Sequence, residues 1–444
     1  MPASPQLPAP TQSPSSPENG PAAQASRGAL LIVFLTVFID LLGFGIVLPV
    51  MPRQAEPYLK ALGLSPLAAG VTIGVLFSVF SLMQFIFSPL WGRISDRIGR
   101  RPMLLLSLVG SVVFYALYGF AVTVPTDRAT TALALMLLSR VGAGIAGASV
   151  GTAAAVIADC TTPANRARGM ALIGIAFGAG FTLGPLIAYF GLALFSQRPW
   201  GVGALASMLS FVALLIAFFI FKETRRPGVR SAKEFPSMSR TAAVLQMPQV
   251  GALVLIYFLA IFSFANFEAT LARLTEAAFQ MNNDDNFLVF AFIGLMLMFA
   301  GGIYRPLAKR LPETRLLTAG IAMMMLGLAC VGLVAWGVSG RQGDAGLLKT
   351  LFYAASAMAV AGFAFVNPSV SALISKNADP DRQGEVLGVN QSFSSLGRIL
   401  GPFVGSMLFA LNSTHTLPYV VAVAVLMFVA TLLPRLSRPA GASG

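Results

Sequence analysis

The stretch SPLWGRISDRIGRRPML, residues 88–104, concentrates charge in a chain that is otherwise poor in it. Five charged residues fall within nine positions, namely Arg93, Asp96, Arg97, Arg100 and Arg101, whereas only 11% of the whole chain is charged. The segments on either side are apolar and long enough to cross a bilayer, which takes about 20 helical residues. The stretch is therefore expected to be a short polar loop between two membrane-spanning helices.

The composition places the chain in a lipid bilayer. With 56% hydrophobic residues among 444 and a mean hydropathy of +0.78, it has too little polar surface to cover a soluble globule. The net charge of +13 does not indicate nucleic-acid binding, because the basic residues lie in short gaps between apolar segments. Cys160 and Cys330 lie far apart without metal-ligand spacing, so no disulfide, metal site or cofactor is expected.

Twelve apolar segments are long enough to span the membrane. They lie approximately at 29–50, 67–90, 102–124, 130–158, 168–191, 200–221, 249–275, 286–306, 314–337, 347–374, 384–411 and 416–434. Lys and Arg are most frequent in the gaps after the second, fourth, sixth, eighth and tenth segments. Because cytoplasmic loops carry an excess of these residues, both termini and the 88–104 stretch are predicted to be cytoplasmic.

The longest polar gap divides the chain into two halves. The predicted units are a disordered cytoplasmic tail at 1–27, a six-helix bundle at 28–221, a cytoplasmic linker at 222–248, a second six-helix bundle at 249–435 and a cytoplasmic tail at 436–444. A shift of 217 residues places Pro89 on Pro306, Gly180 on Gly397 and Gly184-Pro185 on Gly401-Pro402. Such a repeat predicts two similar bundles around a central cavity that opens alternately to either side.

Several motifs support a family resemblance. Gly92, Asp96, Arg97, Gly99, Arg100 and Arg101 form the pattern G-x-x-x-D-R-x-G-R-R; further shared stretches are IDLLGFGIVLPVMP, SRVGAGIAGAS, ADCTTPANRARGMA, FGAGFTLGPLIA and DRQGEVLGVNQSFSSLGRILGP. Residues 28–435 closely resemble the drug:proton antiporter branch of the major facilitator superfamily, which includes the tetracycline efflux proteins. The resemblance implies an all-α membrane protein with the major facilitator fold, twelve transmembrane helices in two pseudo-symmetric six-helix bundles.

The resemblance also implies roles for two groups of residues. In this family the charged loop acts as a conformational latch, with Asp96 near the N-terminus of the eleventh helix and Arg100 or Arg101 facing Asp159. The alternative is a basic loop that only fixes topology. A second group resembles the antiporter motif of this branch: Gly174, Gly178, Gly180, Gly184 and Pro185. Close packing of the fifth helix on a neighbour is both the simpler interpretation of these glycines and their expected mechanism.

Asp40 and Arg140 are predicted to form a proton-coupling site. An ionisable residue in the hydrocarbon costs at least about 2.5–3.5 kcal/mol and usually marks a cavity. Asp40 lies about 11 residues into the first segment and Arg140 about 10 residues into the fourth, so at about 1.5 Å per residue both lie near the midplane. Desolvation favours the neutral acid and a guanidinium favours the carboxylate, so ligand occupancy can switch protonation. A fixed structural ion pair is the alternative.

A further group of polar residues is predicted to line the substrate cavity: Gln84, Glu268, Asn367, Asn390, Gln391 and Arg398. Arg398 either binds an anionic group of the substrate or serves as a structural partner for the seventh helix. Glu268 lies towards the outer end of that helix, where snorkelling to the interface costs little. The amides either offer hydrogen bonds to a substrate or hold helices together.

Departures from the family pattern bear on the substrate. The tetracycline pumps carry an acidic residue at the position of Phe114 and a His near the position of Met296. This chain lacks both, so tetracycline is not the expected substrate. Arg398 in R-x-x-G-P instead resembles the animal tetracycline-transporter-like proteins, for which organic anions are implied. The predicted function is a proton-coupled efflux antiporter for amphipathic drugs or organic anions, working by alternating access. The alternative is a proton symporter or facilitator for a small metabolite.

Other classes of function fit less well. The one His, His415, has no nucleophile, metal or phosphate-loop residues in a pattern with it, so an enzyme is not expected. A non-transporting receptor would lose the coupling residues, yet these are present. We expect a monomer whose partners are protons, a small-molecule substrate and the lipid bilayer, with no nucleic acid. The Ala- and Gly-rich composition favours a bacterial inner membrane.

Overall fold

The computed structural model describes residues 21–161, 163–196, 198–224, 238–340, 344–378 and 383–437, which form helices and contain no strand. The helices are α1 (Pro21–Val47), α2 (Met51–Ala61), α3 (Pro66–Ile98), α4 (Arg100–Ala121), η1 (Thr126–Arg128), α5 (Ala129–Ala146), η2 (Gly147–Ser149), α6 (Val150–Cys160), α7 (Pro163–Leu194), α8 (Gly201–Ile220), α9 (Met238–Leu245), α10 (Pro248–Phe279), α11 (Asn283–Leu307), α12 (Glu313–Ser339), α13 (Ala345–Asn377), α14 (Gln383–Leu411), α15 (Leu417–Leu432) and η3 (Leu433–Ser437).

The spans follow the predicted pattern. Among the described residues, ten helices are long and apolar enough to cross a membrane, with η1, α5, η2 and α6 joined as one span. Shorter apolar helices at 178–192 and 417–432 occupy the places of the fifth and twelfth predicted segments. Two helices were not predicted, α2 after the first span and α9 within the predicted linker. Residues 1–20 and 438–444 of the predicted tails and 225–237 of the linker lie outside the described residues.

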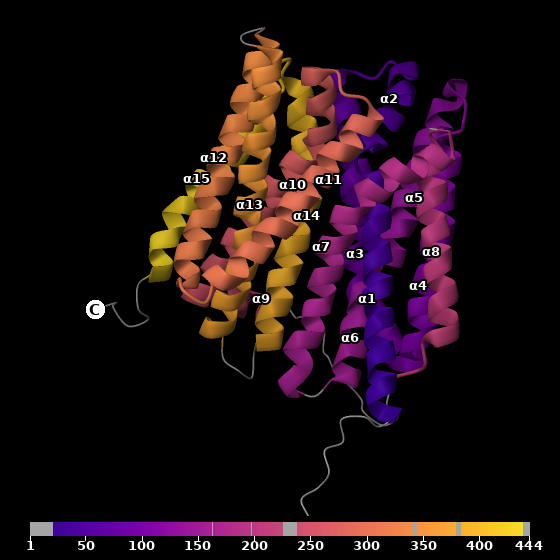
Figure 1. Ribbon diagram of the computed structural model, residues 1–444, viewed down its shortest axis with the longest axis vertical. Coiled ribbons are helices and arrows are strands. Elements are labelled where there is room, and N and C mark those ends of the chain that lie inside the picture. The colour runs from indigo at the N-terminus through magenta and orange to yellow at the C-terminus, as the bar shows by residue number, and fades with distance from the viewer. Residues whose placement is uncertain are drawn as a thin grey trace, which may run out of the picture.

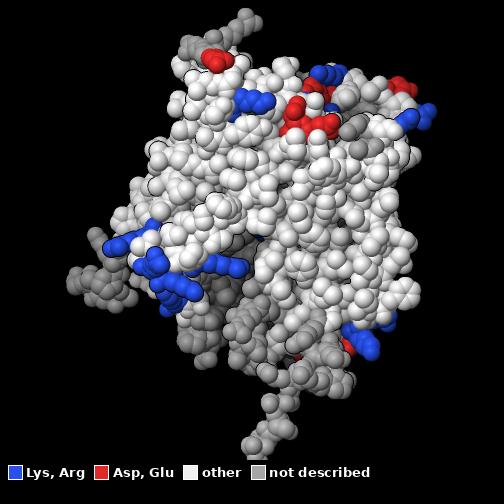
Figure 2. All heavy atoms as spheres, in the orientation of Figure 1, with Lys and Arg blue, Asp and Glu red and all other residues white. Residues whose placement is uncertain are grey.

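The outer surface is apolar where a bilayer would surround it. Large apolar side chains are exposed on it, for example Phe219 at 78% and Phe299 at 67%. Figure 2 shows the described Lys, Arg, Asp and Glu side chains gathered towards the two ends of the molecule, with an uncharged belt between them on this face. This distribution is that of a protein that spans a membrane rather than lying on it.

The two halves pack their helices in the same way. In the first half α7 runs along α1, and in the second α14 runs along α10 (Figure 1). A Cβ added at Gly184 would lie 2.9 Å from the carbonyl carbon of Gly45, and one added at Gly401 would lie 2.6 Å from the Phe262 oxygen. Both contacts need glycine, because a side chain would push the helices apart. Since Gly45 and Phe262 are also 217 positions apart, the repeat extends to its tertiary contacts.

The bundles meet along two pairs of helices, α3 with α14 and α7 with α11. We call the end of the molecule that carries α2 the α2 face and the opposite end, near α9, the α9 face (Figure 1). At the α2 face α3 and α14 touch closely: a Cβ at Gly70 would lie 2.6 Å from the Ser406 oxygen, and Ser78 Oγ donates to Ile399 O at 2.6 Å. Towards the α9 face, Figure 2 shows the surface hollowed between the bundles.

Candidate functional site

The charged residues that were expected in a loop instead end α3 and begin α4, with Gly99 alone between the two helices, and they form a compact ionic cluster at the α9 face. The Arg100 side chain, only 7% exposed, lies 2.5 Å from Asp96 and 2.9 Å from Asp159, and it also donates to Ser95 Oγ at 2.6 Å. Of the two arginines considered as partners of Asp159, Arg100 is the one in contact. Arg101 instead donates to Phe218 O at 2.8 Å. The two carboxylates and the hydroxyl accept hydrogen bonds from the buried Arg100 guanidinium, because a buried charge needs such partners.

Glu223 completes this cluster and was not predicted from the sequence. Its carboxylate accepts from the backbone N–H groups of Arg100 at 2.9 Å and Arg101 at 3.1 Å, so it caps the N-terminus of α4. Gly99 turns the chain with φ +113°, and a Cβ there would lie 2.5 Å from Glu223. The sequence does hold one indication of it. The N-cap of α4 is Gly99, which has no side chain to cap the helix, and free N–H groups at a helix N-terminus attract an acid.

The latch is described only within the first bundle. Asp96, Arg100 and Asp159 lie on α3, α4 and α6, and Gly92 has no atom within 4 Å of an added Cβ. Residues 379–382 and the side chains of 383–385, where α14 begins, lie outside the described residues. The contact of Asp96 with the N-terminus of the eleventh helix, and the inter-bundle role of Arg97, therefore stay predictions.

Asp40 is buried in the first bundle and accepts hydrogen bonds from two serines. Its side chain is 3% exposed; Ser111 donates to one carboxylate oxygen and Ser149 to the other, both at 2.8 Å. The Tyr115 hydroxyl donates to the Asp40 backbone oxygen at 3.1 Å. The hydroxyls compensate part of the desolvation of the acid without adding charge. The serines were missed, because Ser in apolar helices is too common to mark a site.

Arg140 is also buried in the first bundle, but it does not pair with this acid. Its side chain is 2% exposed, and its Cζ lies 5.3 Å from the ring centroid of Phe44 and 4.7 Å from that of Phe80. Its Nε donates to Leu76 O at 3.4 Å. No ion pair joins Asp40 to Arg140, both of which the structure describes. The link between them is Phe44, which lies one turn after Asp40 on α1 and stacks with Arg140.

A cavity of about 50 Å³ lies between the bundles, where the predicted Glu268 and Arg398 come together. It is lined by residues of α1, the turn that follows α1, α3, α10 and α14: Phe44, Leu48, Phe77, Ser81, Ala265, Glu268, Ala269, Arg398 and Pro402. Arg398 donates to Ser394 Oγ at 2.9 Å and Ser395 Oγ at 3.2 Å. Because α10 continues to Phe279, Glu268 lies about 16 Å from its outer end, deeper than expected.

The other predicted cavity residues are placed differently. Gln84 donates to Gly147 O at 2.9 Å and so ties α3 to η2 within the first bundle. Asn367 is exposed and accepts from the Tyr257 hydroxyl at 2.8 Å. Asn390 is 4% exposed with an unbonded side-chain oxygen, and Gln391 is exposed. None of these four lines the 50 Å³ cavity.

The predicted antiporter-motif glycines form the α1–α7 contact. An added Cβ at Gly180 would lie 2.9 Å from Leu41, and Gly184 meets Gly45, near Pro185. Gly178 faces open space, and the surroundings of Gly174 lie outside the described residues. On its other side α7 meets α11, where Thr182 donates to Gly294 O at 3.1 Å. The run therefore sits between the helix that carries Asp40 and the opposite bundle.

Arg53 of α2 joins the bundles at the α2 face, a contact that was not predicted. Its Nε lies 2.9 Å from Glu276, Nη1 donates to Asn283 Oδ1 at 3.1 Å, and Nη2 donates to Met281 O. These acceptors lie at the end of α10, in the turn after it and at the start of α11, so one guanidinium contacts both helices of the second bundle. The sequence does not indicate this contact, because the short polar segment 51–61 cannot be distinguished from a loop.

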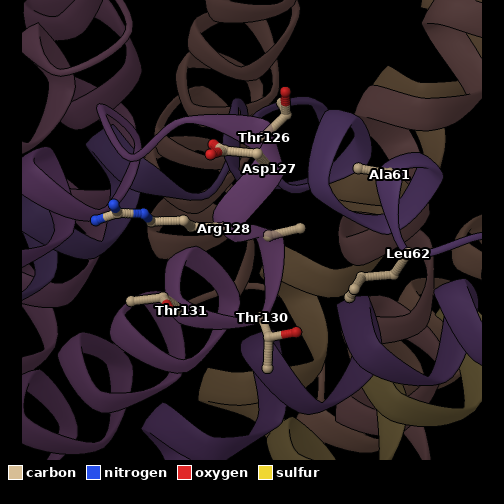
Figure 3. A pocket seen from close by; sticks show the side chains of 8 residues that line it. Ala61, Leu62, Thr126, Asp127, Arg128, Thr130 and Thr131 are labelled. Atoms are coloured by element: carbon tan, nitrogen blue, oxygen red, sulfur yellow. The ribbon is translucent and has the colours of Figure 1, made fainter.

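A larger surface pocket of about 640 Å³ lies at the α2 face, away from the inter-bundle cavity. Its walls are the end of α2 and the start of α5, with Leu62, Asp127 and Arg128 among the lining side chains (Figure 3). It is open and contains no predicted site residue. Across the described ranges, no group of three or more His, Cys, Asp and Glu side chains is placed to hold a metal ion.

The sequence matches the Major Facilitator Superfamily over residues 33–402 and 345–443. "Major facilitator superfamily domain-containing protein 10" of Bos taurus is 31% identical and covers 92% of this chain and 93% of its own length. "Tetracycline resistance protein, class C" of Escherichia coli is 28% identical over 94% and 98%. The crystal structure of the human organic anion transporter MFSD10 (TETRAN) is similar, with a TM-score of 0.60, 27% identity and coverage of 92% and 99%. The predicted fold is thereby confirmed, and the chain belongs to the major facilitator superfamily of membrane transporters.

Proposed function

We propose that this transporter exports amphipathic drugs or organic anions by alternating access, in exchange for protons. The observation that carries the proposal is the cavity between the bundles, which combines Glu268 and Arg398 with the aromatic rings of Phe44 and Phe77. Such a lining suits a molecule with an apolar body and a charged group. Relatives named as tetracycline resistance proteins and as an organic anion transporter support the same substrate range.

The contacts between the bundles support alternating access. α3 and α14 are pressed together at the α2 face, and the surface is hollowed towards the α9 face (Figure 2). We assign the α9 face to the cytoplasm, from the excess of Lys and Arg in the loops predicted there, which places both termini inside. The structure then corresponds to a state that receives substrate from the cytoplasm. The composition supports a bacterial cell membrane, and we propose a monomer as the working unit.

Asp40 is proposed as the proton-carrying group. It is buried, its side-chain partners are hydroxyls, and it lies on the segment of α1 that packs against α7. Since α7 also meets α11, a change in the charge of Asp40 can alter the contact between the bundles. Phe44, one turn after Asp40 on α1, lines the cavity, so a bound ligand contacts the helix that carries Asp40.

The test uses purified protein in liposomes with an acidic interior. Amphipathic anions and cations are added outside while a dye reports the internal pH. For an antiporter, a transported compound enters only as protons leave, and Asp40→Asn abolishes both movements. Asp127→Asn, at an exposed acid in η1, is the matched control and should behave as wild type. Compound that enters together with protons from an acidic exterior would establish symport, and coupling retained in Asp40→Asn would make that acid structural.

A further inference from the structure

The two charges of the inter-bundle cavity do not neutralise each other directly. Glu268 and Arg398 line the same cavity, yet they form neither an ion pair nor a hydrogen bond. Arg398 is held by two hydroxyls of its own helix, which fix its position without adding a negative charge. Throughout the described residues, nothing donates a hydrogen bond to the Glu268 side chain. The cavity therefore presents one carboxyl group and one guanidinium group to whatever enters it.

Electrostatics in a low-dielectric cavity restrict the charge of the ligand. The formal charges of Glu268 and Arg398 sum to zero, so a ligand with a single charge leaves a net charge buried in the membrane. With such a ligand, either Glu268 or Arg398 faces a group of its own charge or has no group of opposite charge to bind. A ligand with one charge of each sign offers a partner to both residues and keeps the sum at zero.

We propose that the cavity selects amphipathic zwitterions, with the anionic group bound to Arg398 and the cationic group to Glu268. The part of the apolar body next to the charged groups lies against Phe44 and Phe77, the two aromatic rings of the lining. A volume of about 50 Å³ accommodates the charged end of such a molecule and not a whole drug-sized ligand, which fills several hundred Å³. The proposal rests on the proposed transport function and narrows its substrate class.

Three probes with one aromatic body test this selectivity. O-benzyltyrosine carries both charges, 3-(4-benzyloxyphenyl)propanoate lacks the amine, and O-benzyltyramine lacks the carboxylate. Binding to the purified full-length protein is measured by titration calorimetry at neutral pH. Wild type should bind the zwitterion at least about tenfold more tightly than either analogue. Glu268→Gln should abolish the preference over the propanoate, and Arg398→Gln the preference over the tyramine.

The controls separate charge from folding and binding from transport. Asp127→Asn removes an exposed acid of η1 that lies outside the cavity and should preserve the wild-type order. Glu268→Ala repeats the test if the Gln variant is recovered aggregated. Equal binding of the zwitterion and the propanoate by wild type overturns the proposal. If wild type prefers the zwitterion but moves no compound across liposomes, the transport function is contradicted and the binding selectivity is not. If wild type transports amphiphiles without any preference for their charge, the binding selectivity is contradicted and the transport function is not.

Discussion

Two arginines with several acceptors each occupy opposite faces of the molecule and differ in what they join. Arg100, at the α9 face, binds Asp96, Asp159 and Ser95, all in the first bundle. Arg53, at the α2 face, belongs to the first bundle and binds Glu276 and neighbouring acceptors in the second. Contacts within one bundle survive when bundles rock against each other, whereas contacts between bundles must break. Arg100 is therefore expected to stabilise the fold, and Arg53 to set the balance between access states.

Replacing Arg100 should have the largest effect. Arg100→Ala leaves two carboxylates without their cation, which should cost about 3 kcal/mol, the lower end for a buried pair, because Asp96 and Asp159 are 29% and 24% exposed. We expect a marked fall in the melting temperature of the purified protein and in its level in the membrane. Arg101→Ala is the matched control, since its half-buried guanidinium contacts the backbone oxygen and the ring of Phe218, and it should cost about 1 kcal/mol or less. Equal losses for the two variants would refute the distinction.

Arg53→Ala should leave stability nearly unchanged and shift the conformational equilibrium. Removing its charge-assisted hydrogen bonds should favour opening at the α2 face by about 1–2 kcal/mol, which is roughly a fivefold to thirtyfold change in population. Ser81→Cys, in the cavity lining, reports this opening through labelling by an impermeant maleimide added from the α2 side. The background lacks Cys160 and Cys330, which are free thiols. Unchanged labelling, or a fall in melting temperature like that of Arg100→Ala, would contradict the prediction.

Gly70→Ala tests the same equilibrium through packing. The added Cβ would lie 2.6 Å from the Ser406 oxygen and 2.7 Å from the Ala410 Cβ, so α3 and α14 must separate at the α2 face. Overpacking of this size should favour opening by about 1 kcal/mol, or roughly fivefold faster labelling of Ser81→Cys. Gly301→Ala, where the new Cβ meets no atom within 4 Å, should label as wild type does. Unchanged or slower labelling in Gly70→Ala would contradict the prediction, because it would mean that α14 accommodates the methyl group without separating from α3.

The contrast between the two faces also separates what the sequence can predict from what it cannot. The spans, the repeat and the contact of an arginine with Asp159 follow from hydropathy, a constant shift and a recognisable motif. The pairing of Arg53 does not, because α2 is too short and polar to be distinguished from a loop, and its partners are more than 200 positions away. Asp40 and Arg140 were expected to share one site because depth along a helix can be counted. Which way each side chain turns around that helix depends on neighbours such as Ser111, Ser149 and Phe80, which only the folded structure provides.

Lys60→Ala should have the smallest effect and decides whether Arg53 or α2 as a whole holds the α2 face closed. Lys60 is exposed and pairs at 2.6 Å with Glu56, four positions earlier on the same helix. The hydrogen bond and charge of Glu56 raise the pKa of Lys60, so this pairing is fully present below the ordinary lysine pKa and is lost only as the pH rises through the raised value. Between about pH 6 and pH 8 the variant should match wild type in melting temperature and in Ser81→Cys labelling, at both ends of the range. If Lys60→Ala instead opened the α2 face as far as Arg53→Ala does, the position of α2 as a helix, and not one guanidinium bound across the bundles, would control access at this face.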